Sequence, residues 1–223
     1  MGKNREQTSS FAETRMTARN NKTPANSRVF STRNMVLIAM FGAISMILML
    51  FDFPTPLAPA FMKFDFADLP AMLATFILGP IEGILVCVVK LVLKLAVRGT
   101  ETAFVGELSN LVCGILYMLP AYFIYKKIRT KKGAILALIA GTLIVSFGCV
   151  LTNYFVIFPM YSKMYGMPLE AIVAAGTAIN SRIDSLFTMM ILCVFPFNIV
   201  KFGSVSVITF LLYKKLKKAL LRR

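Results

Sequence analysis

Between Gly133 and Tyr161 the chain reads GAILALIAGTLIVSFGCVLTNYFVIFPMY, a run of 29 residues without a charged side chain. A run of about 18 or more apolar residues is a candidate for a transmembrane helix, because the hydrocarbon core of a bilayer is about 30 Å thick. Five cations lie directly before this run, in Lys126–Lys132. The pattern predicts a helix that begins at a charged membrane surface and crosses the bilayer.

Other parts of the chain repeat this pattern. Of the 223 residues, 57% are hydrophobic and the mean hydropathy is +0.73, whereas soluble domains are about 45–50% apolar. We therefore predict an all-α membrane protein with six transmembrane helices. The predicted spans are Asn34–Phe51, Asp68–Leu78, Ile81–Ala96, Ala103–Tyr125, Gly133–Phe158 and Ser185–Tyr213, the last of them broken near Pro196.

The placement of the cations predicts the orientation of these spans. The formal net charge is +15, and 1–33, Lys126–Lys132 and Lys214–Arg223 carry seven, five and six Lys or Arg residues. Cytoplasmic segments are enriched in Lys and Arg, so both termini are predicted to be cytoplasmic. Nucleic-acid binding is disfavoured, because it needs a cationic face on a soluble fold. The predicted domains are a disordered basic cytoplasmic tail over 1–33, a six-helix membrane domain over 34–215 and a basic cytoplasmic tail over 216–223.

Residue types that are absent exclude several kinds of chemistry. The chain contains no His, which excludes His-dependent catalytic triads and HExxH zinc sites. No Gly-x-x-x-x-Gly-Lys-Ser/Thr motif occurs, so ATP hydrolysis by a P-loop would require another subunit. The four Cys residues stand singly inside apolar segments, and we expect small buried hydrophobic side chains there, not disulfides or metal ligands.

The loop after the first predicted span has an unusual composition. Residues 58–70 read APAFMKFDFADLP, in which Phe61, Phe64 and Phe66 alternate with charged residues. Aromatic rings interleaved with charges suit a site that holds a flat, partly polar molecule at the membrane surface. Asp68 is also expected to cap the second span, and Asp65 to pair with Lys63.

Polar residues inside the other spans are the second group of candidates. Ionisable groups in a membrane are costly and are commonly functional. We expect a shared cavity on the outer side, formed by Glu107, Asn110, Asn153, Tyr154, Asn198 and Lys201. The alternative for each amide is an interhelical hydrogen bond. Glu107 is a possible structural partner of Lys201, and Lys90 and Lys94 are expected to extend toward the membrane surface.

The first span carries a face of small residues. Ala39 and Ala43 are separated by three residues, and Gly42 lies beside them. Such a face lets another helix approach closely, either in a partner protein or within the same chain.

Four blocks of sequence, in order, resemble a known family. They are FMKFDFADLP (61–70), GELSN (106–110), NYF (153–155) and FPFNIVK (195–201). The chain is similar, over about residues 34–215, to the substrate-binding (S) component of energy-coupling factor (ECF) vitamin transporters, and especially to the riboflavin-specific branch. The resemblance implies that 34–215 is a substrate-binding domain, in which six helices hold one vitamin near the outer surface beneath the first loop.

The resemblance also implies a role and partners. Riboflavin would be the transported ligand, without any cofactor, metal or catalytic activity. Ala39 and Ala43 would contact a transmembrane coupling subunit of the EcfT type that sits on two ABC ATPases in a bacterial cell membrane. The expected substrate-binding residues are Phe61, Phe64, Phe66, Asp68, Glu107, Asn110, Asn153, Tyr154, Asn198 and Lys201. The alternatives are an S component for another vitamin, a stand-alone secondary carrier, and an integral membrane enzyme that uses Asp65 and Asp68.

Overall fold

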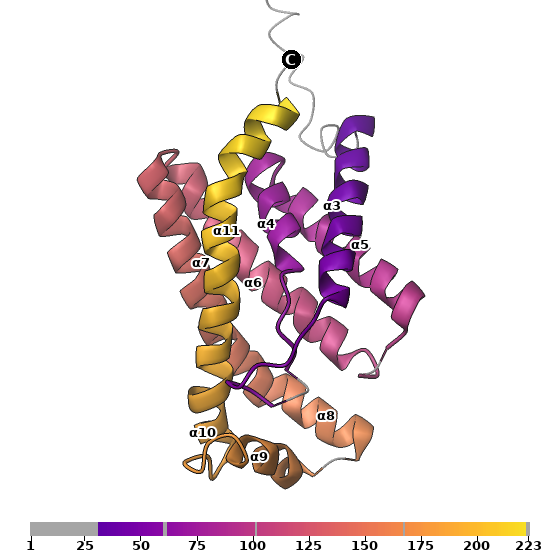
Figure 1. Ribbon diagram of the computed structural model, residues 1–223, viewed down its shortest axis with the longest axis vertical. Helices are drawn as coiled ribbons and strands as arrows, with labels where there is room; N and C mark the ends of the chain where they lie inside the picture. The colour runs from indigo at the N-terminus through magenta and orange to yellow at the C-terminus, as the bar shows by residue number, and fades with distance from the viewer. Residues whose placement is uncertain (1–30, 60–61, 101, 167, 222–223) are drawn as a thin grey trace, which may run out of the picture. The chain divides into compact units, whose positions relative to one another are not determined.

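The computed structural model describes residues 31–59, 62–100, 102–166 and 168–221 (Figure 1). The chain divides into two compact units, residues 1–35 and residues 36–223. Apart from residues 32–35 at the start of the first described helix, the features below belong to the second unit, which is described by itself. The predicted tail over 1–33 lies almost wholly outside the described residues.

All regular structure in the described part of the chain is helical. The helices are α3 (Thr32–Leu50), α4 (Asp68–Ile77), α5 (Pro80–Arg98), α6 (Val105–Lys127), α7 (Lys131–Thr152), α8 (Phe158–Tyr165), α9 (Leu169–Thr177), α10 (Leu186–Met189) and α11 (Phe195–Leu221). Two π-helical segments, η1 (Asn153–Ile157) and η2 (Met190–Val194), join α7 to α8 and α10 to α11. The all-α prediction is confirmed for these residues.

Within the residues that the structure describes, four helical segments are long and apolar enough to cross a membrane. They are Thr32–Leu50, Val105–Lys127, Lys131–Met164 and Leu186–Leu216. The predicted second and third spans form helices, but α4 has only ten residues and α5 contains four charged residues. The six-span topology therefore stays a prediction.

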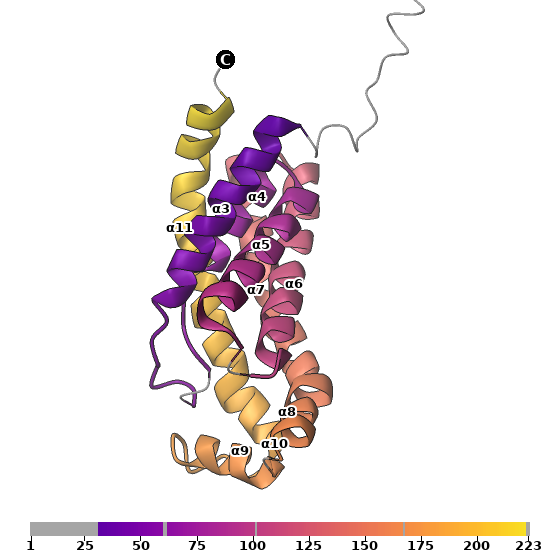
Figure 2. The same cartoon turned by 90° about the vertical axis from the view of Figure 1, so that its right-hand side faces the viewer.

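The shortness of α4 follows from the residues after it. Gly79 has a φ of 152°, a conformation that favours glycine, and Pro80 then begins α5. A Cβ at Gly83 would collide with Thr75 Oγ1, so the two helices approach closely. The α4 helix also packs against α6 and α11, which places it inside the bundle (Figures 1 and 2).

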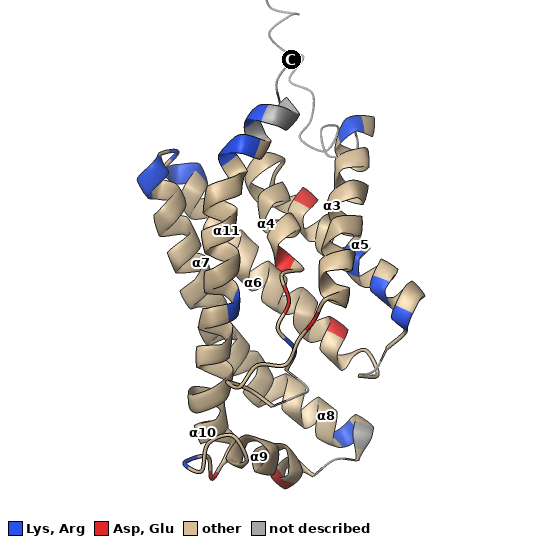
Figure 3. Cartoon of the chain, viewed as in Figure 1, with Lys and Arg blue, Asp and Glu red and all other residues tan. Residues whose placement is uncertain are grey.

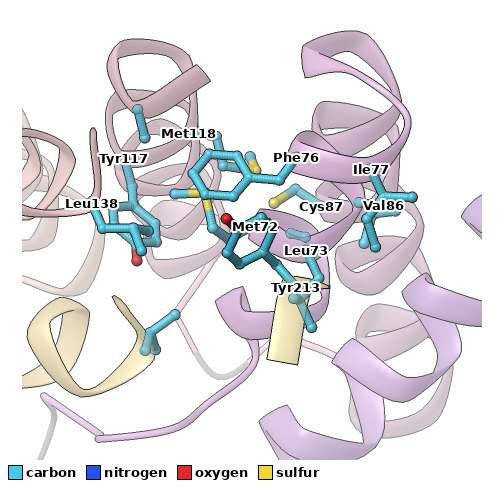
Figure 4. Packing of buried hydrophobic residues seen from close by; sticks show 14 of the residues in the cluster. Met72, Leu73, Phe76, Ile77, Val86, Cys87, Tyr117, Met118, Leu138 and Tyr213 are labelled. Carbon is cyan, nitrogen blue, oxygen red and sulfur yellow. The ribbon is translucent and has the colours of Figure 1, made fainter. Parts of the chain in front are cut away.

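The main core surrounds α4. Figure 4 shows Met72, Leu73 and Phe76 of α4 beside residues of α5, α6, α7 and α11. Met72 and Tyr117 are fully buried. Cys113 of α6 is paired with Cys149 of α7 as a disulfide, with Cα atoms 6.2 Å apart, so the expectation of four separate thiols is wrong for this pair. Packing of α6 against α7 brings these two positions together, which the spacing of cysteines along the chain does not indicate.

Candidate binding site

Two neighbouring cavities lie between the loop that precedes α4 and the helices α6, α8 and α11. Their volumes are about 160 and 300 Å³, and pockets for drug-sized ligands begin at about 300 Å³. Lys63, Gly106, Asn110, Tyr161 and Lys201 line both cavities, so we describe the two as one site.

The structure brings together most of the polar residues that the sequence singles out. The smaller cavity is lined by Asp68, Asn110, Asn153, Asn198 and Lys201. Glu107 lies at the larger one. These residues come from the start of α4 and from α6, η1 and α11, which are far apart along the chain.

Asn153 and Asn198 are held by the backbone next to the two π-helical segments. Asn153 Nδ2 donates to the carbonyl of Cys149 (2.6 Å), and Asn198 Nδ2 donates to the carbonyl of Val194 (2.7 Å). A π-helical turn disturbs the regular hydrogen bonding of a helix and is common at functional sites. In the described part of the chain, neither Oδ1 accepts a hydrogen bond from protein. Each amide is therefore fixed and keeps an acceptor for a ligand.

Lys201 is paired with the loop that precedes α4. Its Nζ lies 2.9 Å from Asp65 Oδ2, and both side chains are buried. Asp65 Oδ1 accepts a hydrogen bond from the Ala67 amide (2.9 Å). The expected pairing of Asp65 with Lys63 is wrong, because Lys63 Nζ lies instead 3.3 Å from Asp52 Oδ2. Lys201 takes Asp65 because a buried ammonium requires an anionic partner, and the loop brings this carboxylate to it.

Lys90 forms a second buried ion pair. Its Nζ donates to Asp68 Oδ1 (2.8 Å) and to Asn110 Oδ1 (2.7 Å), and its side chain is fully buried. The expectation that Lys90 extends toward the membrane surface is therefore wrong. Asp68 is likewise not a helix cap: Ala67 occupies that position, without any side-chain hydrogen bond to the helix. Lys90 faces the interior of the bundle, so Asp68 serves as its counter-ion.

Glu107 pairs with Lys94, and not with Lys201 as considered above. Lys94 Nζ donates to Glu107 Oε1, while Thr102 Oγ1 donates to Oε2 (2.9 Å). Each carboxylate that lines the site thus lies within 3.5 Å of a cation. The pairs are Asp52 with Lys63 and Arg98, Asp65 with Lys201, Asp68 with Lys90, and Glu107 with Lys94.

Three of the predicted aromatic residues, Phe64, Phe66 and Tyr154, do not line the cavities. The Phe64 ring is buried, with its centroid 5.1 Å from Phe53, 5.4 Å from Phe66 and 6.2 Å from Phe197. Two backbone hydrogen bonds of 3.0 Å between Phe53 and Phe64 close the loop on itself. The half-buried Tyr154 packs against the cluster formed around η1 and α8. Phe61 lies outside the described residues.

Other aromatic residues line the site, and sequence reasoning missed them as site residues. They are Phe158, Tyr161, Phe197 and Phe202. Phe197 precedes Lys201 by four residues, so the two share a helix face. This four-residue spacing could have identified Phe197 as a site residue from the sequence.

The small residues of α3 point in two directions. Ala39 and Ala43 are exposed, whereas Gly42 is buried. A Cβ at Gly42 would collide with the Val89 side chain of α5. Packing within the chain therefore involves Gly42, and the two alanines remain accessible.

Comparisons with known proteins agree with this architecture. The model of the family described as "ECF transporter, substrate-specific component" matches residues 33–213. Riboflavin transporter FmnP of Bacillus subtilis (strain 168) is 33% identical over 186 residues, which are 83% of this chain and 92% of that protein. Riboflavin transporter RibU of Staphylococcus aureus (strain TCH60) is 33% identical over 85% of this chain and 93% of its own.

A solved structure agrees as well. It is described as "Structure and mechanism of the S component of a bacterial ECF transporter" and has a TM-score of 0.65 and 32% identity, covering 85% of this chain and 98% of its own. The chain therefore belongs to the family of substrate-specific components of ECF transporters, which are transport subunits and not enzymes.

Proposed function

We propose that this chain binds riboflavin at the outer side of a bacterial cell membrane and delivers it to the cytoplasm as the S component of an ATP-driven transporter. The observation that carries the proposal is the convergence of Asn153, Asn198 and Lys201 in one cavity with aromatic walls. The names of the two relatives described above support the choice of riboflavin.

The chemistry of the site suits a flavin. The isoalloxazine ring is flat and apolar on its faces, and aromatic pairs contribute about 0.5–1.5 kcal/mol each beyond the buried area. Phe158, Phe197 and Phe202 supply such surfaces. The pyrimidine edge of the ring has carbonyl acceptors for the Lys201 ammonium and an N–H donor for an Asn Oδ1.

The electrostatics of the site favour an uncharged ligand. Because each lining carboxylate is already paired with a cation, no carboxylate is left to attract a cationic ligand, and a neutral vitamin leaves these ion pairs intact. The ribityl hydroxyls of riboflavin both donate and accept hydrogen bonds. Asn110, Glu107 and Ser109 together present both hydrogen-bond donors and acceptors for these hydroxyls.

The topology and partners are part of the same proposal. We propose six spans with cytoplasmic termini and polar tails over 1–33 and 216–223, with the short α4 and the charged α5 shielded by neighbouring helices. The accessible Ala39 and Ala43 would contact an EcfT-type coupling subunit. The sequence has no P-loop, so two ABC ATPases would supply the energy.

The test is mass spectrometry of the small molecule that copurifies with the full-length protein after growth in medium containing several vitamins. Riboflavin, at up to one molecule per chain, is the expected result. A different vitamin, or none after growth with excess riboflavin, would contradict the assignment. Uptake into vesicles that contain only this chain would instead indicate a secondary carrier, and chemical conversion of the vitamin would indicate an enzyme.

A further inference from the structure

A groove that the vitamin site does not use runs between α7 and α11. Its volume is about 460 Å³, and its rim carries Ile139 and Leu143 of α7 and Val207 and Leu211 of α11, all at least one-third exposed. A Cβ built on Gly203, in its wall, would meet nothing within 4 Å. The groove is therefore open, apolar and separate from the cavity that contains Lys201.

The hydroxyl groups next to the groove are already satisfied. Ser206 Oγ lies 2.6 Å from Tyr117 Oη and 2.9 Å from Thr142 Oγ1. An apolar chain can cover these residues without leaving a buried hydroxyl unpaired, which would otherwise cost free energy.

The register of the two helices places lysines at one end of the groove. Ser206 Oγ donates to the carbonyl of Leu138 (3.4 Å), so these two residues are level, and the helices run in opposite directions. Seven residues before Leu138 is Lys131, and eight after Ser206 is Lys214. Because each residue adds about 1.5 Å along a helix, these lysines lie at about the same height.

The lysines also continue the faces that line the groove. On α7, Lys131 and Lys132 precede Ile135 by four and three residues. On α11, Lys214 and Lys215 follow Phe210 and Leu211 by four residues, which is about one helical turn. All four side chains are exposed, and Figure 3 shows cations where α7 begins and α11 ends. No acidic residue lines the groove among the described residues.

We propose that this groove binds an anionic phospholipid of the cytoplasmic leaflet. One acyl chain lies between α7 and α11, and the phosphate contacts Lys131, Lys132, Lys214 and Lys215. Clusters of basic residues at a membrane surface attract anionic lipids. The groove supplies close packing for the chain, which is the main source of apolar association inside a membrane. A helix of a partner protein fits the four cations less well unless it ends in acidic residues at the same height.

The test compares two lipids that differ only in the headgroup. Full-length protein is incubated with equal amounts of phosphatidylglycerol and phosphatidylcholine of identical chains, and bound lipid is counted by native mass spectrometry. We expect at least a tenfold preference for phosphatidylglycerol. The triple variant Lys131→Gln/Lys132→Gln/Lys214→Gln should lose most of it. The matched triple Lys126→Gln/Lys127→Gln/Arg129→Gln, which removes three cations near the end of α6, should keep it.

The acyl-chain part of the proposal has its own variants. Val207→Phe and Gly203→Leu fill the groove from the rim and from the wall, and each should lower bound phosphatidylglycerol several-fold. Monodisperse elution of the purified protein shows that a variant is folded. If one of the two variants does not fold, the other is enough to test the acyl-chain site. If the two triple variants lose the preference for phosphatidylglycerol equally, the proposal is overturned, because the lipid then responds to the overall surface charge and not to the lysines beside the groove. Unchanged lipid binding in the folded groove variants would overturn it as well.

Discussion

Lys201 of α11 and Asp65 of the loop that precedes α4 form a buried ion pair, with Nζ and Oδ2 2.9 Å apart. The pair joins the loop to Lys201, which lines the cavity, although the two residues are 136 positions apart in the sequence. An ammonium has three donors, so Lys201 can hold Asp65 and still donate to a ligand carbonyl. Binding of the proposed ligand and the position of the loop are therefore coupled through one side chain.

Replacement of Lys201 should affect both stability and binding. Lys201→Met leaves the Asp65 carboxylate buried without a cation, and breaking such a pair costs about 3–5 kcal/mol of unfolding free energy. Denaturation in detergent micelles measures this change. In the double variant Lys201→Met/Asp65→Leu most of the stability should return, but riboflavin binding should not. Recovery of both would show that Lys201 only positions the loop. For stability alone, Lys63→Met is the control, because its partly exposed pair with Asp52 should contribute less than about 1 kcal/mol.

The Lys90 pair should behave as a structural element of the bundle. Lys90→Met should destabilise the protein by about 3–5 kcal/mol, since Asp68 and the Asn110 carbonyl lose their common donor. Lys90→Met/Asp68→Leu should recover most of this loss, because neither charge then remains buried. The same denaturation experiment distinguishes the outcomes. Equal stability of Lys90→Met and the wild type would mean that this lysine reaches water.

The amides beside the π-helical segments should determine affinity. Asn153→Ala and Asn198→Ala each remove a ligand acceptor and the side-chain hydrogen bond that fixes the amide to a backbone carbonyl. A lost hydrogen bond of about 1–3 kcal/mol corresponds to roughly 5- to 150-fold weaker riboflavin binding. Calorimetric titration measures it. Tyr154→Phe is the control, because Tyr154 lines neither cavity, and a similar loss in this variant would count against the assignment.

The exposed face of α3 should be required for transport but not for binding. In Ala39→Leu/Ala43→Leu, the larger side chains should block close approach of the coupling subunit, so vitamin uptake should fall while riboflavin affinity stays unchanged. Gly42→Leu should instead weaken folding, because it collides with Val89. Leu136→Trp on exposed α7 is a surface control. Normal uptake by the Ala39→Leu/Ala43→Leu variant would exclude this interface.

Asp184, which precedes α10, is an acidic group outside the spans whose pKa is shifted. Hydrogen bonds, first from the Thr188 hydroxyl (2.9 Å), lower the pKa of the exposed Asp184 below its usual range. The carboxylate form is therefore favoured in the folded protein, and its contribution is lost only as the pH falls below about 4. Thr188→Val should raise this pKa, which the carbon-13 shift of the Asp184 carboxyl reports. An unchanged titration would mean that the hydroxyl does not bond to it.

Charge-free runs made α3 and α7 predictable from the sequence, because these spans differ sharply in composition from the polar segments beside them. The choice of Lys201, Asn153 and Asn198 also rested on a local signal, since polar groups inside spans are costly. The identity of each ion-pair partner was not predictable. Lys201 could have met Glu107 or Asp65, and the path of the loop decides between them.

The aromatic residues show a similar limit. The alternation of Phe64 and Phe66 with charges suggested rings over a ligand, but Phe64 packs on Phe53 and Phe197. Composition alone does not distinguish a ring that supports a loop from one that faces a cavity. The π-helical segments were also missed, because no residue pattern marks a one-residue insertion in a helix.

Titration of the purified, ligand-free protein with riboflavin, followed by quenching of flavin fluorescence, tests the central claim most directly. We predict saturation at one riboflavin per chain, with an affinity in the nanomolar to micromolar range. The Asn153→Ala/Asn198→Ala variant should bind at least about 30-fold more weakly, because two hydrogen bonds of at least about 1 kcal/mol each are lost. Absence of quenching by the folded wild-type protein, or equal affinity of the folded double variant, would contradict the account.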